Sequence, residues 1–198
     1  MAIQDRRARE YAKRYQLIIA TARRLAESEG WDAVTTRRLA AEIEYSQPVL
    51  YKHFGCMDEI VQAVAVEGFA ELADTLRAAR SGAPDPEQAL HRIAHAFSDF
   101  AGANQAVYDA MFIRATDLPF GTDETPPDLV AAFTEIRDAI ADATPEAEAD
   151  TLAEVFWGAL HGLAMLTRSG RLRPAQHDER IDLLVGRFLL AEVTASGR

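Results

Sequence analysis

Apolar positions recur at helical spacing along the whole 198-residue chain. In run after run they are separated by three or four positions, which places them on one face of a helix. Alternating runs of β-branched residues, which are typical of strands, are few. The pattern therefore predicts an all-α fold. The main apolar stripes lie within residues 18–26, 61–76, 90–101, 108–115, 129–140, 152–163 and 181–189.

Residues 35–54 contain two short helical patterns separated by a turn. Thr35 or Thr36 can cap the first helix, and Ser46 followed by Pro48 suits the start of the second. Polar and basic side chains are left on the outer face of the second helix. The spacing predicts a helix-turn-helix, in which the first helix braces the second against a major groove. Five apolar residues would face inward: Leu39, Ala40, Ile43, Leu50 and Phe54.

Residues 46–54, SQPVLYKHF, resemble the S-x-x-x-L-Y-x-H-F signature of the TetR family of transcriptional repressors. Thr36, Leu39 and Ala40 also fit the helix that precedes the turn in that family. Glu44 stands where the family often has Gly. A left-handed backbone at Glu44 would cost roughly 1–2 kcal/mol, and a slightly different turn is the alternative. Without the resemblance, the same stretch could be an ordinary helical pair packed in a core.

The C-terminal half carries a second, looser resemblance. Residues 156–162, FWGALHG, are similar to the W-x-x-x-H-G segment of the WHG subgroup of TetR-like C-terminal domains. The resemblance implies effector binding and dimerisation in this half. The residue pattern supports dimerisation, because the helix expected at 152–163 is apolar on two faces, and Gly158 and Gly162 leave a shallow groove. We therefore expect the last two helices to form a four-helix interface between two copies.

These patterns predict a division into two domains. Residues 1–55 would form a three-helix DNA-binding head, and residues 56–198 would form a larger helical bundle for effector binding and dimerisation. The long helical pattern at 57–80 would then be the only covalent and mechanical link between head and body.

The charge distribution supports this division. The formal net charge is −10, but residues 1–55 carry 10 Lys and Arg against 7 Asp and Glu. Residues 56–198 carry 11 basic and 24 acidic residues, so a basic head orients an acidic body away from a polyanion. Five basic side chains lie within residues 1–14, which form either an arm that reaches DNA or a solvated tail.

Double-stranded DNA is therefore the expected partner of the head. Tyr51, Lys52 and His53 carry groups that suit phosphate oxygens. Gln47 could read an adenine edge, and Val49 could contact a thymine methyl group. The predicted DNA-binding residues are Thr36, Arg37, Ser46, Gln47, Pro48, Val49, Tyr51, Lys52 and His53. Arg37 and Arg38 either add charge to this surface or belong to a solvated helix face.

The TetR resemblance further implies a cavity in the body for a small apolar or amphipathic effector. Aromatic residues at helical spacing usually fill a core, so only some of the large side chains would line that cavity. His161 either bonds a polar group of a ligand or is a satisfied core histidine. The candidate ligand-binding residues are Phe97, Phe100, Tyr108, Met111, Phe112, Phe133, Trp157 and His161.

Other chemistry is weakly indicated. His91, His95 and Asp99 recur at i, i+4 and i+8 and could offer metal ligands, but they also suit a polar helix face, and no fourth ligand is evident. We therefore predict no metal and no cofactor. Cys56 is the single cysteine, which suits a reducing compartment. It is either a redox switch or a small capping residue.

The predicted function is that of a homodimeric, sequence-specific DNA-binding regulator. It would be a repressor that binds a pseudo-palindromic operator and is released by a small-molecule effector, and an effector-independent dimeric DNA-binding protein is the alternative. No nucleophile motif or phosphate-binding loop indicates an enzyme. No apolar run reaches the length of a membrane span and no signal peptide opens the chain, so we expect a cytoplasmic protein without membrane contact.

Overall fold

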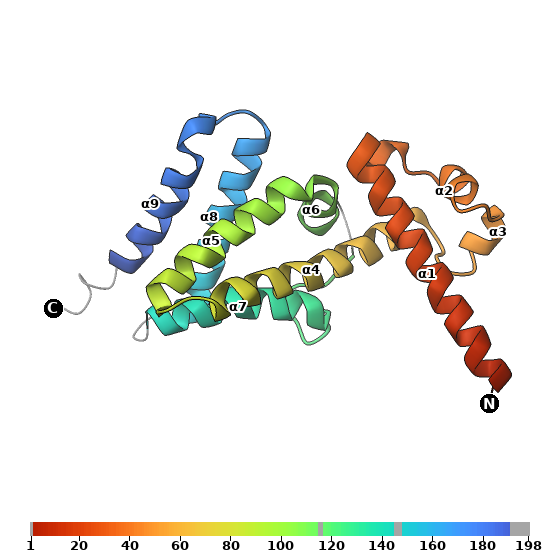
Figure 1. Ribbon diagram of the computed structural model, residues 1–198, viewed down its shortest axis with the longest axis horizontal. Coiled ribbons are helices and arrows are strands. Elements are labelled where there is room, and N and C mark those ends of the chain that lie inside the picture. The colour runs from red at the N-terminus through yellow and green to blue at the C-terminus, as the bar shows by residue number, and fades with distance from the viewer. Residues whose placement is uncertain (1, 115–116, 145–147, 191–198) are drawn as a thin grey trace. The chain divides into compact units, whose positions relative to one another are not determined.

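The computed structural model describes residues 2–114, 117–144 and 148–190, and every regular element in these ranges is a helix (Figure 1). The all-α prediction is confirmed. The elements are α1 (Ala2–Glu29), η1 (Trp31–Ala33), α2 (Thr36–Glu42), α3 (Gln47–Leu50), α4 (Met57–Ser81), α5 (Pro86–Ala103), α6 (Gln105–Phe112), α7 (Pro127–Ala143), α8 (Ala149–Arg168), η2 (Pro174–Gln176) and α9 (His177–Leu190).

The chain folds into two compact units that do not follow the order of the sequence. The first unit comprises Met1–Gly68 and Asn104–Thr122, and the second comprises Phe69–Ala103 and Asp123–Arg198. The chain therefore passes between the units three times, once within α4 and once on each side of Asn104–Thr122. The prediction that the long helix is the only link is wrong, because α6 belongs to the first unit. The functional division at residue 55 stays a prediction.

The first unit is built on the apolar face of α1. Ile18, Ala22 and Leu25 are almost completely buried on this face. Gly30 ends α1 with φ of +83°, a conformation that glycine adopts without strain. Trp31 follows in η1 and is also buried.

Polar contacts attach α6 to α1 and η1. The Trp31 Nε1–H donates to the carbonyl oxygen of Ala106 at 2.8 Å. The Glu27 carboxylate accepts from the backbone N–H groups of Ala106 and Val107, each at 3.1 Å. A carboxylate at this position satisfies two orphan donors of α6 and complements the helix dipole. α6 is therefore held to α1 by directed bonds as well as by packing.

Gly68 allows α4 and α6 to approach each other within the first unit. A Cβ atom at Gly68 would lie 2.4 Å from Val107 Cγ1 and 2.7 Å from Met111 Sδ. A larger residue fits there only if the Val107 and Met111 side chains or α6 itself shift. The close contact makes the N-terminal part of α4 and α6 a single packed pair.

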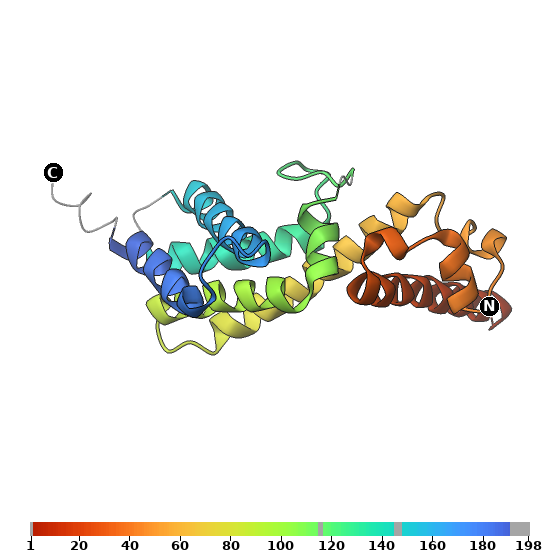
Figure 2. The same ribbon diagram turned by 90° about the horizontal axis from the view of Figure 1, so that it is seen from above.

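The second unit packs α5, α7, α8 and α9 together with the C-terminal part of α4 (Figures 1 and 2). Its core includes Phe97 of α5, Ile136 of α7 and Phe156 of α8, each at most 3% exposed. Phe156 also meets Phe188 of α9 edge to face, with ring centroids 5.0 Å apart. The helical spacing read from the sequence thus corresponds to this core.

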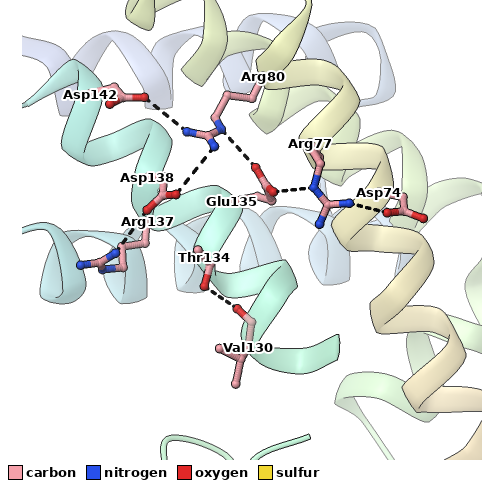
Figure 3. Close-up of polar contacts among 9 residues, drawn as sticks. All are labelled: Asp74, Arg77, Arg80, Val130, Thr134, Glu135, Arg137, Asp138 and Asp142. Carbon is pink, nitrogen blue, oxygen red and sulfur yellow. Dashed lines mark hydrogen bonds and ion pairs between the residues drawn. The ribbon is translucent and has the colours of Figure 1, made fainter. Parts of the chain in front are cut away.

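A buried carboxylate joins α4 to α7 within the second unit (Figure 3). The Glu135 side chain is 9% exposed. Its Oε1 accepts from Arg77 Nε at 2.9 Å, and its Oε2 accepts from Arg80 Nε at 3.1 Å. Arg80 continues to Asp142 at 3.3 Å, and this outer pair is exposed to water. Because each oxygen of Glu135 has its own cationic donor, its burial is compensated.

We predict that Glu135→Gln lowers the free energy of unfolding by about 1–3 kcal/mol, since one charge-assisted bond would be lost at a buried site. Asp74→Asn is the matched control. The Asp74 carboxylate also contacts Arg77, at 2.6 Å, but its side chain is 77% exposed, so its loss should change stability by less than about 1 kcal/mol. Denaturant titration of both variants measures the difference. Equal losses would contradict the role given to Glu135.

Candidate nucleic-acid interface

The turn between α2 and α3 follows local backbone chemistry. Thr35 caps α2, because its Oγ1 accepts from the backbone N–H of Arg38 at 3.2 Å. Glu44 has φ of +57°, so its backbone adopts the left-handed conformation at the position where the family often has Gly. Ser46 stands at the N-cap position of α3 and Pro48 lies in its first turn. The predicted cap at Thr35 and the left-handed turn at Glu44 are therefore present, whereas Ser46 stands at the N-cap position without a side-chain capping bond.

The recognition segment, residues 46–54, is anchored from behind. α3 itself is short, Gln47–Leu50, and continues as hydrogen-bonded turns to His53. Leu50 is 1% exposed and Phe54 is 5% exposed, so both face inward as predicted. The Phe54 ring stacks on Tyr15 of α1 with centroids 4.8 Å apart. Packing against α1 thus fixes which face of the segment is turned outward.

The outward face carries most of the predicted DNA-binding side chains. Ser46, Gln47, Pro48 and Lys52 are exposed, and Tyr51 is 53% exposed. Val49 is half-buried at the edge of the same face. The Ser46 hydroxyl makes no capping bond, so it remains available as a donor. Hydroxyl, amide and ammonium groups on one exposed surface suit the oxygen atoms of a DNA backbone and the edges of bases.

His53 differs from its neighbours. Its ring is half-buried and lies 4.1 Å from the Tyr11 ring, centroid to centroid. Burial, with a smaller contribution from Arg14, lowers the pKa of His53 below its ordinary value. The structure therefore places a neutral imidazole against α1, where it helps to position the recognition segment.

The two arginines of α2 have different surroundings. Arg37 is exposed and makes no ion pair within the part of the chain that the structure describes. Arg38 forms a bidentate pair with Glu29 of α1, in which both distances are 2.7 Å. The hydrogen bond to Glu29 also raises the pKa of Arg38. Arg38 is thus a bridge between α1 and α2, whereas Arg37 and the half-buried Thr36 remain beside the outer face.

Sequence reasoning did not predict two contacts that α1 makes with the recognition segment and with the turn before it. The Tyr11 hydroxyl donates to the carbonyl oxygen of Lys52 at 3.4 Å. The Arg14 guanidinium lies 5.7 Å from the centroid of the Tyr45 ring. The available signal was the spacing, because Tyr11 precedes the buried Ile18 by seven residues and so lies on the same helical face.

The candidate effector residues are divided between the two units. Tyr108, Met111 and Phe112 belong to the first unit, and the rings of Tyr108 and Phe112 lie 4.6 Å apart. The other five belong to the second unit: Phe97, Phe100, Phe133, Trp157 and His161. Burial, followed by the charge of Arg168, lowers the pKa of His161, so its imidazole is neutral at pH 7.

The histidine pair of α5 contacts α9 and not Asp99. His91 Nδ1 and His95 Nε2 lie 3.2 and 2.9 Å from Asp182 Oδ1, while Asp99 is exposed. The hydrogen bond from His95, and to a smaller extent that from His91, lowers the pKa of the Asp182 carboxyl. Within residues 2–114, 117–144 and 148–190, no three His, Cys, Asp or Glu side chains are arranged to hold a metal ion.

The helices in these ranges are also too short or too polar to cross a membrane.

Comparison with known proteins places this geometry in a family. An uncharacterized HTH-type transcriptional regulator, YobS of Bacillus subtilis (strain 168), is 29% identical over 105 residues, which make up 52% of this chain and 53% of the relative. The uncharacterized HTH-type transcriptional regulator Rv0681 of Mycobacterium tuberculosis (strain ATCC 25618 / H37Rv) is 26% identical over 156 residues, 77% of this chain and 69% of the relative. The chain thus spans about half the length of the Bacillus relative.

Solved structures show the same fold. A protein with unknown function from Rhodococcus sp. RHA1 superposes with a TM-score of 0.77 at 23% identity, over 90% of this chain and 94% of that one. A TetR variant from Acinetobacter baumannii AYE in complex with minocycline gives 0.63 at 21% identity, over 88% and 96% of the two chains. At this identity the likeness establishes the fold alone.

Family assignments cover most of the sequence. Residues 90–188 match the family described as "Tetracyclin repressor-like, C-terminal domain". Residues 18–64 match "Bacterial regulatory proteins, tetR family", and this range contains the complete helix-turn-helix. The chain belongs to the TetR family of bacterial regulatory proteins.

Proposed function

We propose that the protein is a cytoplasmic, homodimeric repressor that binds a pseudo-palindromic DNA operator and releases it when a small effector binds. One observation carries the proposal. The recognition segment is anchored by Leu50 and Phe54 and presents Gln47, Tyr51 and Lys52 to solvent. A braced helix with exposed polar and basic side chains is the arrangement that helix-turn-helix proteins place in a major groove.

The exposed residues divide by chemistry into two groups. Tyr51, Lys52 and Arg37 carry donors that suit phosphate oxygens, and the hydroxyls of Ser46 and Thr36 can add backbone contacts. Gln47 and Val49 lie at the start of the segment, where side chains reach base edges. His53 would act mainly by positioning its neighbours, because its ring packs on Tyr11.

An unpartnered apolar stripe on α8 supports the dimer. Val155 is 55% exposed and Leu166 is 39% exposed, and they lie eleven residues apart, which is three helical turns. Gly158 and Gly162 lie between them on the same face, and a Cβ at either would have no neighbour within 4 Å. On α9, Leu183 is 58% exposed. A second copy packed on α8 and α9 would cover these side chains.

A small-molecule effector is the proposed regulator. Its binding residues would come from the five candidates of the second unit, of which Phe133, Trp157 and His161 are only half-buried. The Acinetobacter TetR structure is a complex with minocycline, which supports a small-molecule ligand for this fold. Membership of the WHG subgroup rests on residues 156–162 and is part of the proposal.

An effector-independent dimeric DNA-binding protein is the second candidate. In that case the second unit would only dimerise, and operator affinity would not respond to any ligand. The neutral, half-buried imidazole of His161 beside the half-buried Trp157 favours the ligand-responsive version, because such a group can exchange hydrogen bonds with a ligand. We propose no enzymatic activity.

Selection of bound duplexes from a random DNA library tests the proposed function. The parent protein should enrich a two-fold symmetric motif with half-sites about one helical turn apart, or a multiple of it. Tyr51→Ala should weaken binding to all sequences about equally, because a phosphate contact carries no base information. Tyr51→Phe isolates the hydroxyl from the ring. If Tyr51→Ala changed the selected motif, Tyr51 would be a base contact and not a phosphate contact. If the parent enriched no motif, the proposed function would be contradicted.

Gln47→Ala should relax the preference at one base pair of each half-site. Loss of a bidentate contact to a base edge reduces discrimination by about 1–3 kcal/mol at that position. Gln16→Ala is the matched control, since Gln16 is equally an exposed glutamine but lies on α1. Affinities for all single-base variants of the selected site measure the effect. A uniform loss across positions would move Gln47 to the group of phosphate contacts.

Val155→Asp should dissociate the dimer, because two carboxylates would be buried where two helices meet. Val130→Asp is the matched control, because Val130 is 49% exposed on α7, outside the proposed interface. Light scattering should give half the parent mass for Val155→Asp and the parent mass for Val130→Asp. Operator affinity should fall only for the first variant. A dimer that survives Val155→Asp would exclude this face of α8.

A further inference from the structure

We propose that Arg7 of α1 forms an additional contact with the phosphate backbone of duplex DNA, beside the contacts made by the recognition segment. The inference rests on the proposed DNA-binding function and adds a second binding element to it. This element lies on the first helix, outside the helix-turn-helix, and α1 reaches the interface with one particular face.

The first observation is the position of α1 along the recognition segment. The helix begins at Ala2, many residues before the buried core, and Figure 1 shows its N-terminal end extending past α3. Tyr11 contacts both the carbonyl oxygen of Lys52 and the ring of His53. Three residues later, Arg14 lies over the ring of Tyr45. One face of α1 therefore contacts the recognition segment and the turn that precedes it.

Helical periodicity then separates the basic residues of α1. Arg7 precedes Tyr11 by four residues and Arg14 follows it by three, so all three lie on the face that meets the recognition segment. Arg9 and Lys13 each lie two residues from Tyr11, which is about 200° around the helix. Two arginines of one helical turn, Arg7 and Arg9, are thus directed to opposite sides.

The surroundings of Arg7 leave its charge available. It is exposed and forms no ion pair with any residue that the structure describes. The neighbouring carboxylate of Glu10 is occupied by Arg6 at 3.0 Å and by Arg14 at 3.9 Å. A guanidinium can bond two phosphate oxygens at once, so a free arginine on this face suits a DNA backbone.

The regular backbone of α1 decides the kind of contact. Residues 2–14 are helical, so this segment differs from an extended arm that enters a minor groove. Tyr11 contacts Lys52, and Arg7 lies one helical turn before Tyr11 on the same face of α1, on the side of the donors proposed for phosphates, Tyr51 and Lys52. The proposed contact therefore extends the same phosphate row and adds affinity without sequence preference.

The test compares Arg7→Gln with Arg9→Gln in the full-length protein, on the duplex selected by the parent and on a scrambled duplex. Both variants remove one positive charge from exposed sites of the same helix. Affinity is measured between about 50 and 200 mM salt, where each phosphate contact contributes about 0.9 to the slope of log K against log salt. Arg7→Gln should reduce the slope by about one on both duplexes, and Arg9→Gln should match the parent.

Arg7→Lys and thermal unfolding complete the design. A lysine keeps the charge, so Arg7→Lys should retain the parent slope, and all variants should unfold at the parent temperature because both sites are exposed. Equal slopes for Arg7→Gln and Arg9→Gln, with the selected motif still bound, would overturn the inference and leave the proposed function intact. Failure of the parent to bind either duplex would overturn both.

Discussion

The buried face of α1 is the constraint on which the DNA-binding surface depends. Ile18 and Leu25 have almost no exposure, and Leu50 and Phe54 complete the same core from the recognition segment. Hydrophobic packing is not directional, so it fixes the segment only because many contacts are made at once. The outward residues take no part in that packing. Their identities can therefore serve recognition without loss of stability, which explains why an exposed tyrosine such as Tyr51 is tolerated.

Local signals in the sequence were sufficient for the start of α2. Thr35 could be recognised as a cap, because its side chain acts on the backbone of its immediate neighbours. The position of α6 could not be read in this way. Glu27 binds backbone groups 79 and 80 residues further along the chain. A solvated glutamate and one that caps a distant helix look the same in a sequence.

The candidate site was predictable to the same extent. The outward side chains of the recognition segment followed from periodicity, since a buried Leu50 and Phe54 leave Tyr51 and Lys52 on the other side. Periodicity did not distinguish Arg37 from Arg38, because both are charged residues near the helix surface, and only the bidentate partner Glu29 separates them. The spacing of the α5 histidines likewise did not reveal their role, because their common partner, Asp182, lies on α9.

The division into units constrains how an effector could act. A Cβ at Gly68 would clash with Val107, so the part of α4 that ends at Gly68 packs closely on α6 within the first unit, which also holds the recognition segment. Beyond Gly68 the same helix belongs to the second unit, where Arg77 and Arg80 tie it to Glu135. A proposed effector need not open either contact. A tenfold loss of operator affinity corresponds to about 1.4 kcal/mol of coupling, and by linkage the effector then binds the DNA-bound form tenfold more weakly. That energy is no larger than the about 1–3 kcal/mol expected for the loss of one charge-assisted bond at Glu135, so coupling of this size does not require the whole ion-pair cluster to open.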